Sequence, residues 1–284
     1  MILKEFLEQY STSEACLDKI KSVRFGFKPF CNGCDRRRSF RKIKGRPVYQ
    51  CGAGHQISPL VDTVFEKSTT PLQYWFYAMW LVGATRGGIS AKQLQRELGV
   101  TYKTAWRMMK QIRILMGKDK DEKLDGIVEV DESYFGGKGM NRAYEWEQCK
   151  RSKDIVMGMV QRSGKAYMKH IAHANKETLV KEVKEHVSAK AHVMTDEHPG
   201  YKSLYQEGYS NHHTVNHVAK EYVRKRLFHT NSVEGLWGRI KPGVKGVYRK
   251  VSGKYIESYM DEYCFRYNNR KSPDQVFDLL LARI

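Results

Sequence analysis

Two apolar segments that each contain an aspartate constrain the fold of this chain more than any other feature. They are VEVDESYFGG, residues 128–137, and HVMTDEHPGY, residues 192–201. Both patterns predict buried strands, with Asp131 and Asp196 at the strand ends before turn residues. Neighbouring strands would bring the two carboxylates together at one sheet edge, where their repulsion requires a cation such as Mg²⁺ or Mn²⁺. Each aspartate taken alone is better explained as an ordinary turn residue, but two of them in a basic chain, with a third acid downstream, favour the metal site.

The segments around these strands predict a mixed α/β domain from about residue 125 onward. Residues 154–172 have the pattern of a strand hairpin, and residues 174–187 that of a helix. Residues 212–223 predict a further short strand, and the rest of the chain is expected to be mostly helical.

A third acid, Glu234, lies in HTNSVEGLWGRIKPG, residues 229–243. On a helix, Glu234, Trp237 and Lys241 share one face, at positions i, i+3 and i+7. A carboxylate with a lysine two turns along suits a metal-bound phosphodiester, with one group on the metal and the other on the phosphate. The alternative is a variant capping box, in which Asn231 and Glu234 only stabilise the start of the helix.

The charge of the chain predicts a polyanionic partner. The 50 Lys and Arg residues exceed the 31 Asp and Glu residues, giving a formal net charge of +19. The excess is concentrated in residues 35–46 and 220–254, a density typical of nucleic-acid-binding surfaces. A solvated basic surface without a partner is the alternative interpretation.

No feature of the sequence predicts insertion into a membrane. The most apolar run, residues 75–84, is far too short to span a bilayer. The N-terminal residues contain acids and lack the apolar core of a signal peptide. We therefore expect a soluble, cytoplasmic protein, in which cysteines are metal ligands or free thiols rather than disulfides.

Within residues 1–60, the cysteine spacing resembles the two knuckles of a zinc ribbon. Cys31 and Cys34 form a CxxC pair, and Cys51 begins a second knuckle. Gly54 stands where the fourth cysteine would be, so His55 is the nearest replacement ligand. Three thiolates and one imidazole would satisfy tetrahedral Zn²⁺. A site that has lost one ligand and three unrelated cysteines are the alternatives.

Residues 70–117 predict a helix-turn-helix, centred on SAKQLQRELGVTYKTAWRMMKQI. Ser90 and Thr101 are expected to cap two helices, with Gly99 in the turn between them. The outward residues of the second helix, which suit contact with a DNA major groove, are Tyr102, Lys103, Thr104, Arg107 and Lys110. An ordinary helical hairpin in a bundle is the alternative.

Together these features resemble the DDE transposases of bacterial insertion sequences, in the ISXO-like group related to the eukaryotic Merlin elements. The resemblance covers nearly the whole chain. It rests on four motifs in order: VDESYFGGK, TDEHPGY, HTNSVEGLWGRIKPGVKGVYRKVS and YMDEYCFRYNNR. It implies a zinc ribbon in residues 1–60, a helix-turn-helix in residues 70–117 and an RNase H-like catalytic domain in residues 125–284.

The resemblance also implies roles for individual residues. Asp131, Asp196 and Glu234 correspond to the family triad, which would hold two Mg²⁺ or Mn²⁺ ions about 4 Å apart. Lys241 corresponds to the family's basic residue seven positions after the third acid. The expected activity is binding, cutting and joining of double-stranded DNA at the element ends and target, by a homodimer or higher oligomer. A DNA-binding protein without catalysis, and a metal-dependent nuclease that does not join ends, are the alternatives.

Overall fold

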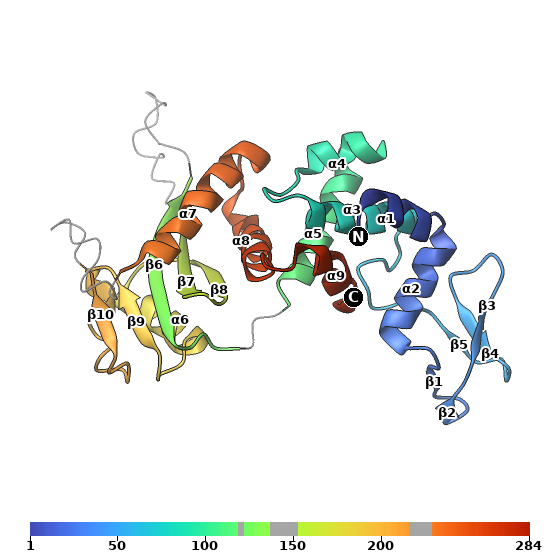
Figure 1. The fold of residues 1–284 in the computed structure, drawn as a ribbon, viewed down its shortest axis with the longest axis horizontal. Helices are drawn as coiled ribbons and strands as arrows, with labels where there is room; N and C mark the ends of the chain where they lie inside the picture. The colour runs from blue at the N-terminus through green and yellow to red at the C-terminus, as the bar shows by residue number, and fades with distance from the viewer. Residues whose placement is uncertain (119–121, 137–152, 216–228) are drawn as a thin grey trace. The chain divides into compact units, whose positions relative to one another are not determined.

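The computed structural model describes residues 1–118, 122–136, 153–215 and 229–284. The chain forms two compact units (Figure 1). The first comprises Met1–Leu115 with Ser272–Ile284, and the second comprises Met116–Lys271. In the described ranges, no helix is both long and apolar enough to cross a membrane.

Helices with aromatic side chains build the core of the first unit. They are α1 (Leu3–Gln9), α2 (Ser13–Phe25), α3 (Leu72–Ala84), α4 (Ala91–Leu98), α5 (Tyr102–Met116) and α9 (Val276–Ala282). The rings of Phe6, Tyr10, Phe76 and Phe277 meet with centroids 5.0 to 5.8 Å apart. Because Phe277 belongs to α9, the last helix folds with the N-terminal unit. The predicted catalytic domain, residues 125–284, thus extends into the first unit at its C-terminal end.

The junction between α4 and α5 has the local structure that the sequence predicts. The side chain of Ser90 accepts a hydrogen bond from the Gln93 N–H, and that of Thr101 accepts one from the Thr104 N–H. Gly99 ends α4 with φ +65°, in the left-handed region that favours glycine. The inward side chains of the two helices that are fully buried include Leu94, Ala105, Met109 and Ile112.

Short strands surround the cysteines of the first unit. They are β1 (Phe30–Cys31), β2 (Arg36–Arg37), β3 (Phe40–Lys42), β4 (Tyr49–Cys51) and β5 (Gln56–Ile57). β1 and β2 form an antiparallel pair, and β3, β4 and β5 form a separate antiparallel sheet. The small core beneath these strands consists of Leu17, Cys31, Phe40, Tyr49 and Cys51.

A mixed five-stranded sheet forms the centre of the second unit, with the strand order β10-β9-β6-β7-β8. The strands are β6 (Ile127–Phe135), β7 (Asp154–Gln161), β8 (Ala166–Ile171), β9 (His192–Thr195) and β10 (His212–Thr214). β6, β7 and β8 pair antiparallel, whereas β6 with β9 and β9 with β10 pair parallel. The hairpin predicted for residues 154–172 is β7 and β8. Of the strand predicted for residues 212–223, β10 covers the start, and the part from residue 216 lies outside the described residues.

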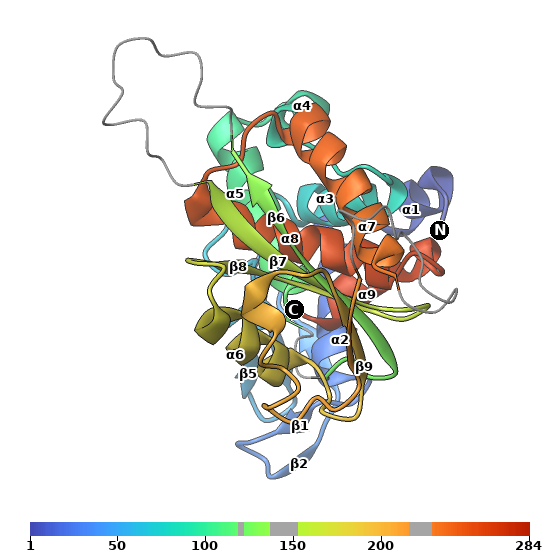
Figure 2. The same ribbon diagram turned by 90° about the vertical axis from the view of Figure 1, so that its left-hand side faces the viewer.

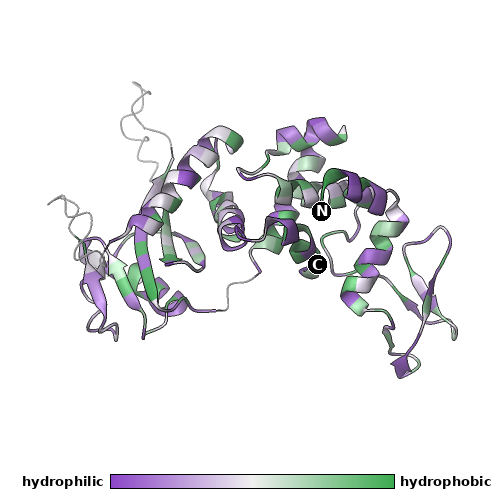
Figure 3. Cartoon of the chain, viewed as in Figure 1, coloured by the Kyte–Doolittle hydropathy of each residue, from purple (hydrophilic) through white to green (hydrophobic). Residues whose placement is uncertain are grey.

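Helices cover both faces of this sheet (Figure 2). They are α6 (Lys176–His186), α7 (Asn231–Gly243) and α8 (Gly253–Asn268). Alternate residues of the strands divide between the two faces. Val128 and Val130 pack with α6, whereas Val156 and Val160 pack with α7 and α8. In Figure 3 the strands of this sheet carry hydrophobic segments interrupted by hydrophilic ones, and the second unit has a mixed α/β fold.

Candidate functional site

Asp131 lies inside β6 rather than at its end, so the sequence-based expectation about the strand end was wrong. β6 continues to Phe135 because every residue from Val128 onward pairs with β7, Asp131 opposite Gly158. The parallel pairing of β6 with β9 ends earlier, at Glu129 opposite Met194. Continuing that register by two residues brings Asp131 level with Asp196, where the parallel strands part. The two aspartates therefore meet where one side of β6 is unpaired.

The carboxyl group of Asp131 lies in a crowded and acidic environment. Its Oδ1 accepts a hydrogen bond of 2.8 Å from the Glu132 N–H, and its Oδ2 accepts one of 3.0 Å from Trp237 Nε1. Burial and the charge of Asp196, with a smaller contribution from Glu234, raise the pKa of Asp131 to about 6, although both hydrogen bonds oppose the rise. The charges of both other acids predicted as metal ligands therefore act on Asp131.

Helix α7 carries Glu234, and a buried acid of β6 holds the start of that helix. Both Ser232 N–H and Val233 N–H donate to Glu129 Oε2, at 2.6 and 3.1 Å. Ser232 Oγ and Arg162 Nε donate to the other carboxylate oxygen, at 2.9 and 2.6 Å. Glu129 is fully buried. A carboxylate at a helix N-terminus accepts hydrogen bonds from the free N–H groups of the first turn, and the positive end of the helix dipole stabilises its charge.

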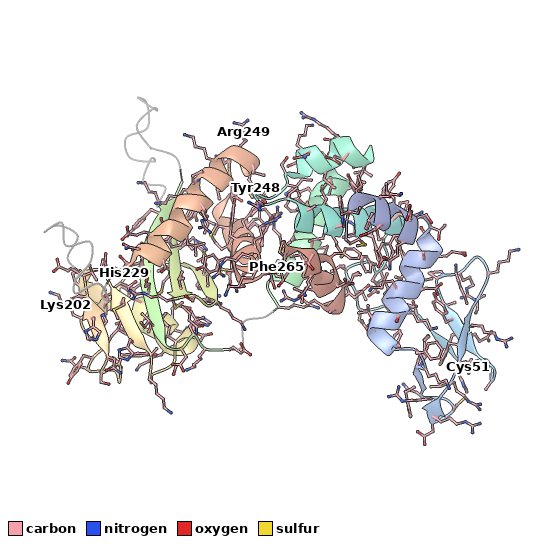
Figure 4. All side chains as sticks on the ribbon, in the orientation of Figure 1. Cys51, Lys202, His229, Tyr248, Arg249 and Phe265 are labelled. Carbon is pink, nitrogen blue, oxygen red and sulfur yellow. The ribbon has the colours of Figure 1, made fainter. Side chains whose placement is uncertain are left out.

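Glu129 was not predicted from the sequence as part of the site. Its signal was available in VEVDES, where a charged residue interrupts an apolar strand two positions before Asp131 and therefore points to the same sheet face. Arg162 links this cluster further, because its guanidinium also donates to the carbonyl oxygen of His229, the residue labelled near α7 in Figure 4. The strand of Asp131 and the helix of Glu234 are thus joined by one buried polar network.

Glu234 itself is exposed on the first turn of α7, and the capping-box alternative does not describe this helix. Asn231 is the first helical residue and Thr230 precedes it as the N-cap. Glu129 of β6 accepts the N–H groups of Ser232 and Val233 at the helix start. The Glu234 carboxylate accepts a hydrogen bond of 2.7 Å from Thr230 Oγ1.

Trp237 connects α7 to Asp131, and Gly158 makes room for its indole. A Cβ atom on Gly158 would lie 2.5 Å from Trp237 Cζ2, which no side chain could tolerate without displacing the ring. Lys241 is exposed one turn further along α7. Glu234, Trp237 and Lys241 therefore follow one another along a continuous helix, as the sequence predicted.

A second acid beside Asp131, Glu132, was also not identified from the sequence. Its side chain accepts a hydrogen bond of 2.6 Å from the buried Tyr201 hydroxyl. Burial is the main cause that raises the pKa of Glu132 to about 7, and the charges of Asp196 and Asp131 add to it, whereas the Tyr201 hydrogen bond opposes it. Asp196 Oδ1 accepts a hydrogen bond of 3.0 Å from the His198 N–H. The TDEHPGY motif therefore packs its polar groups against the VDES segment.

This donor set fits divalent cations. The groups are hard carboxylate oxygens, and their mutual repulsion favours a bound positive charge. Among the described residues, the three predicted ligands are not a group whose ligand atoms all lie within 4.8 Å of one another.

Cys31, Cys34, Cys51 and His55 meet at one point of the first unit, where Figure 4 labels Cys51. The Cys51 sulfur lies 3.8 Å from that of Cys31 and 3.9 Å from that of Cys34. His55 Nδ1 lies 3.6, 3.3 and 3.7 Å from the sulfurs of Cys31, Cys34 and Cys51. Zn–S bonds of about 2.3 Å and Zn–N bonds of about 2.0–2.1 Å give tetrahedral edges of about 3.8 and about 3.5 Å. The cluster therefore has the dimensions of a Cys₃His zinc site.

Two glycines explain why histidine replaces a fourth cysteine here. Gly54 has φ +89°, which would strain a cysteine at that position, and the turn instead presents the next residue, His55. A Cβ atom on Gly33 would lie 2.5 Å from the His55 ring, so only glycine lets the imidazole reach the sulfurs. The two glycines thus allow the turn to place the His55 ring beside the three sulfurs.

The predicted DNA-contacting residues of α5 differ in their surroundings. Tyr102, Lys103 and Arg107 are exposed, whereas Thr104 and Lys110 are half-buried. Arg107 donates a hydrogen bond of 2.9 Å to Ser68 Oγ and lies over the ring of Trp75. Arg107 therefore also braces the segment before α3, a structural contact that the sequence did not predict.

Residues 123–268, just over half of the chain, match the family of the ISXO2-like transposase domain. The chain belongs to this transposase family.

A relative of this transposase is an uncharacterized protein in transposable element ISH50 of Halobacterium salinarum. The two are 38% identical over 95 residues, which are 33% of this chain and 30% of the relative. The alignment therefore spans less than a third of that protein. Both similarities associate the transposase with insertion sequences.

The family match nearly coincides with the second unit of the transposase. It contains Asp131, Asp196, Glu234 and Lys241, and it ends before α9. The Cys₃His cluster and α5 lie outside the matched residues. The family match therefore gives no information about the first unit, whose features come from its own geometry.

Proposed function

We propose that this transposase binds the ends of its insertion sequence and catalyses divalent-metal-dependent DNA cleavage and strand transfer. The observation that carries the proposal is the electrostatic coupling of Asp131 with Asp196 and Glu234. An acid after a neighbouring strand and an acid on a helix both act on the charge of the buried Asp131. A perturbed pKa caused by burial together with nearby like charges supports a functional site.

The sheet supports an RNase H-like assignment for the second unit. Its first three strands along the chain are antiparallel, and the next two add parallel to the free side of the first. The first acid lies on β6 and the second follows β9, which is adjacent to it. This arrangement agrees with the catalytic fold that the family resemblance implies.

Asp131, Asp196 and Glu234 would hold two Mg²⁺ or Mn²⁺ ions. Bound ions of this kind activate an attacking oxygen and stabilise the leaving oxygen of a phosphodiester. In the protein itself, Trp237 orients Asp131 by donating to Oδ2, and Glu129 fixes the helix of Glu234. Lys241 would contact a DNA phosphate as a point charge, which an ammonium group does well.

The first unit would recognise DNA. A Zn²⁺ ion held by Cys31, Cys34, Cys51 and His55 would stabilise the small sheets, whose own hydrophobic core is thin. Helix α5 would lie in the major groove with Tyr102, Lys103 and Arg107 outermost. The transposase would act as a homodimer or higher oligomer, because two element ends must be processed together.

The decisive experiment is a strand-transfer assay with labelled DNA that carries the terminal repeats of the element. We expect Mg²⁺-dependent cleavage and joined products from the wild-type chain, and neither from Glu234→Gln. Glu177→Gln is the matched control, because it makes the same change at an exposed position of α6. Cleavage without joining would instead indicate a nuclease, and DNA binding without cleavage would indicate a repressor.

A further inference from the structure

The last turns of α6 bring together a second group of potential metal ligands. Glu182, Glu185 and His186 offer ligand atoms that all lie within 4.8 Å of one another. His186 Nε2 is 3.4 Å from Glu182 Oε2 and 3.8 Å from Glu185 Oε1. The positions i, i+3 and i+4 place all three on one side of the helix.

Glu182 provides an independent indication of a missing ligand. The residue is only 8% exposed, and its Oε2 is buried without a hydrogen-bond partner. The same oxygen faces His186 Nε2 at a geometry that does not form a hydrogen bond. Buried polar atoms are nearly always satisfied, so an unsatisfied carboxylate oxygen indicates a ligand that would satisfy it.

The imidazole is held so that its nitrogen faces these carboxylates. The ring of His186 stacks on Tyr167 of β8, with centroids 3.8 Å apart and planes at 29°. Lys169 donates its hydrogen bond to Glu257 on α8. Burial is the first cause that raises the pKa of Glu182, and the charge of Glu185 adds to it, whereas the charges of Lys169 and Lys181 oppose the rise. The group thus combines two carboxylates with an imidazole nitrogen that ring stacking holds in place.

We propose that Glu182, Glu185 and His186 bind one Zn²⁺ ion, with the remaining coordination position open to water. Zinc accepts imidazole nitrogen and carboxylate oxygen at about 2.0–2.2 Å, and three protein ligands with one water are typical of an open zinc site. Bonds of about 2.05 Å give tetrahedral edges of about 3.3 Å. The distances of 3.4 and 3.8 Å would need only small side-chain movements to reach this geometry.

The site is separate from both metal sites of the proposed function. It uses no thiolate, unlike the Cys₃His cluster, and α6 packs on the sheet face opposite to α7, which carries Glu234. Its occupancy would fasten the end of α6 and stabilise the second unit by mass action. The competing explanation is a simple ion pair between Glu182 and a protonated His186.

The test measures Zn²⁺ and Co²⁺ binding to the full chain. Asp131→Asn is used as the background, so that ions at the candidate catalytic site are weakened. We expect one weakly held equivalent beyond the Cys₃His site, with affinity at least tenfold lower in Glu182→Gln, Glu185→Gln and His186→Ala. Glu177→Gln on the same helix is the matched control and should bind like the background. Co²⁺ at this site should lack the thiolate charge-transfer absorption that the Cys₃His site produces.

The variants keep the proposal testable if a buried substitution disturbs folding. Glu185 is exposed, so Glu185→Gln should fold normally and still lose affinity. Equal stoichiometry and affinity in all these chains would overturn the proposal and leave the ion pair as the explanation. A second equivalent that persists in Glu185→Gln and Glu182→Gln would overturn it as well, because the ion would then lie elsewhere.

Discussion

At the scale of single residues, the folded structure disfavours the charged form of the Asp131 carboxyl group. Its pKa is raised to about 6 from an ordinary value near 3.8, so the folded chain binds a proton more tightly than the unfolded chain. Stability from this group is therefore present below pH 4 and is lost as the pH rises from about 4 to about 6. At pH 7 the charged carboxylate costs stability unless a cation compensates it.

We accordingly expect Asp131→Asn to abolish cleavage and yet to stabilise the metal-free chain at pH 7, by about 1–3 kcal/mol. Chemical denaturation at pH 7 and at pH 4 checks this, because the gain should largely disappear at the lower pH. Asp125→Asn, at an exposed position just before β6, serves as the control and should change neither property. A destabilised Asp131→Asn chain would mean that the carboxylate is compensated within the protein.

Trp237 offers a second test at this scale. Its Nε1 donates to Asp131 and lowers the pKa of that carboxyl. Trp237→Phe keeps most of the ring but removes the donor, so the pKa of Asp131 should rise above about 6. The acidic limb of the pH profile for Mg²⁺-dependent cleavage should then move to higher pH. An unshifted profile, with reduced activity at all pH values, would assign Trp237 a packing role only.

At the scale of elements, the strand β6 and the helix α7 act as a pair. Free N–H groups at the start of α7 donate hydrogen bonds to Glu129, two residues before Asp131 on the same strand. Glu129→Gln removes the charge that four donor groups share, and we expect a loss of about 2–4 kcal/mol in the free energy of unfolding. Cleavage should fall further than stability alone explains, because Glu234 is carried by the loosened helix.

That expectation can be separated from a merely structural effect. Measured well below the unfolding temperature, Glu129→Gln should need more Mg²⁺ for half-maximal cleavage, while its affinity for element-end DNA stays near that of the wild type. Ser232→Ala removes one hydroxyl donor and leaves the carboxylate, so it should raise the Mg²⁺ concentration for half-maximal cleavage by a smaller amount. A normal Mg²⁺ requirement would show that Glu129 stabilises α7 without positioning Glu234.

The periodicity of the sequence was sufficient to predict the elements, but not the contacts between them. Alternation and helical spacing predicted β6, the β7–β8 hairpin and α6, because these patterns depend only on which face is buried. The position of Asp131 within β6 was wrong because pairing with β7 continues the strand beyond this acid. Glu129 and Glu132 were missed because their partners lie far along the chain, at Ser232 and Tyr201.

The cysteine cluster is an example in which the positions of the ligands favour one of several interpretations of the sequence. Spacing alone left three interpretations open, and the four ligand positions favour the one with His55. We expect purified chain to contain one tightly bound Zn²⁺ and His55→Ala to lose it, whereas His55→Cys should retain it poorly because Gly54 orients an imidazole. Elemental analysis checks this, and zinc retained by His55→Ala would indicate a different fourth ligand.

At the scale of the whole molecule, the family match and the units of the structure divide the chain at the same place. The matched residues end at 268, and the chain re-enters the first unit at Ser272. Four apolar side chains of α9, those of Val276, Phe277, Leu280 and Leu281, are buried in that unit. The C-terminal helix therefore packs with the first unit and not with the second.

The last prediction follows from that division. Phe277→Ala removes an aromatic ring that packs against α1 and α3, and should destabilise the first unit by about 3–5 kcal/mol. Hydrogen exchange should accelerate in α1, α3 and α5 and stay unchanged in β6, β7 and β9. Affinity for element-end DNA should fall, whereas Mg²⁺ binding should persist. Asp274→Asn, an exposed change three residues earlier, is the control. Equal loss of protection in both units would mean that they unfold as one, and that the helix stabilises the whole chain.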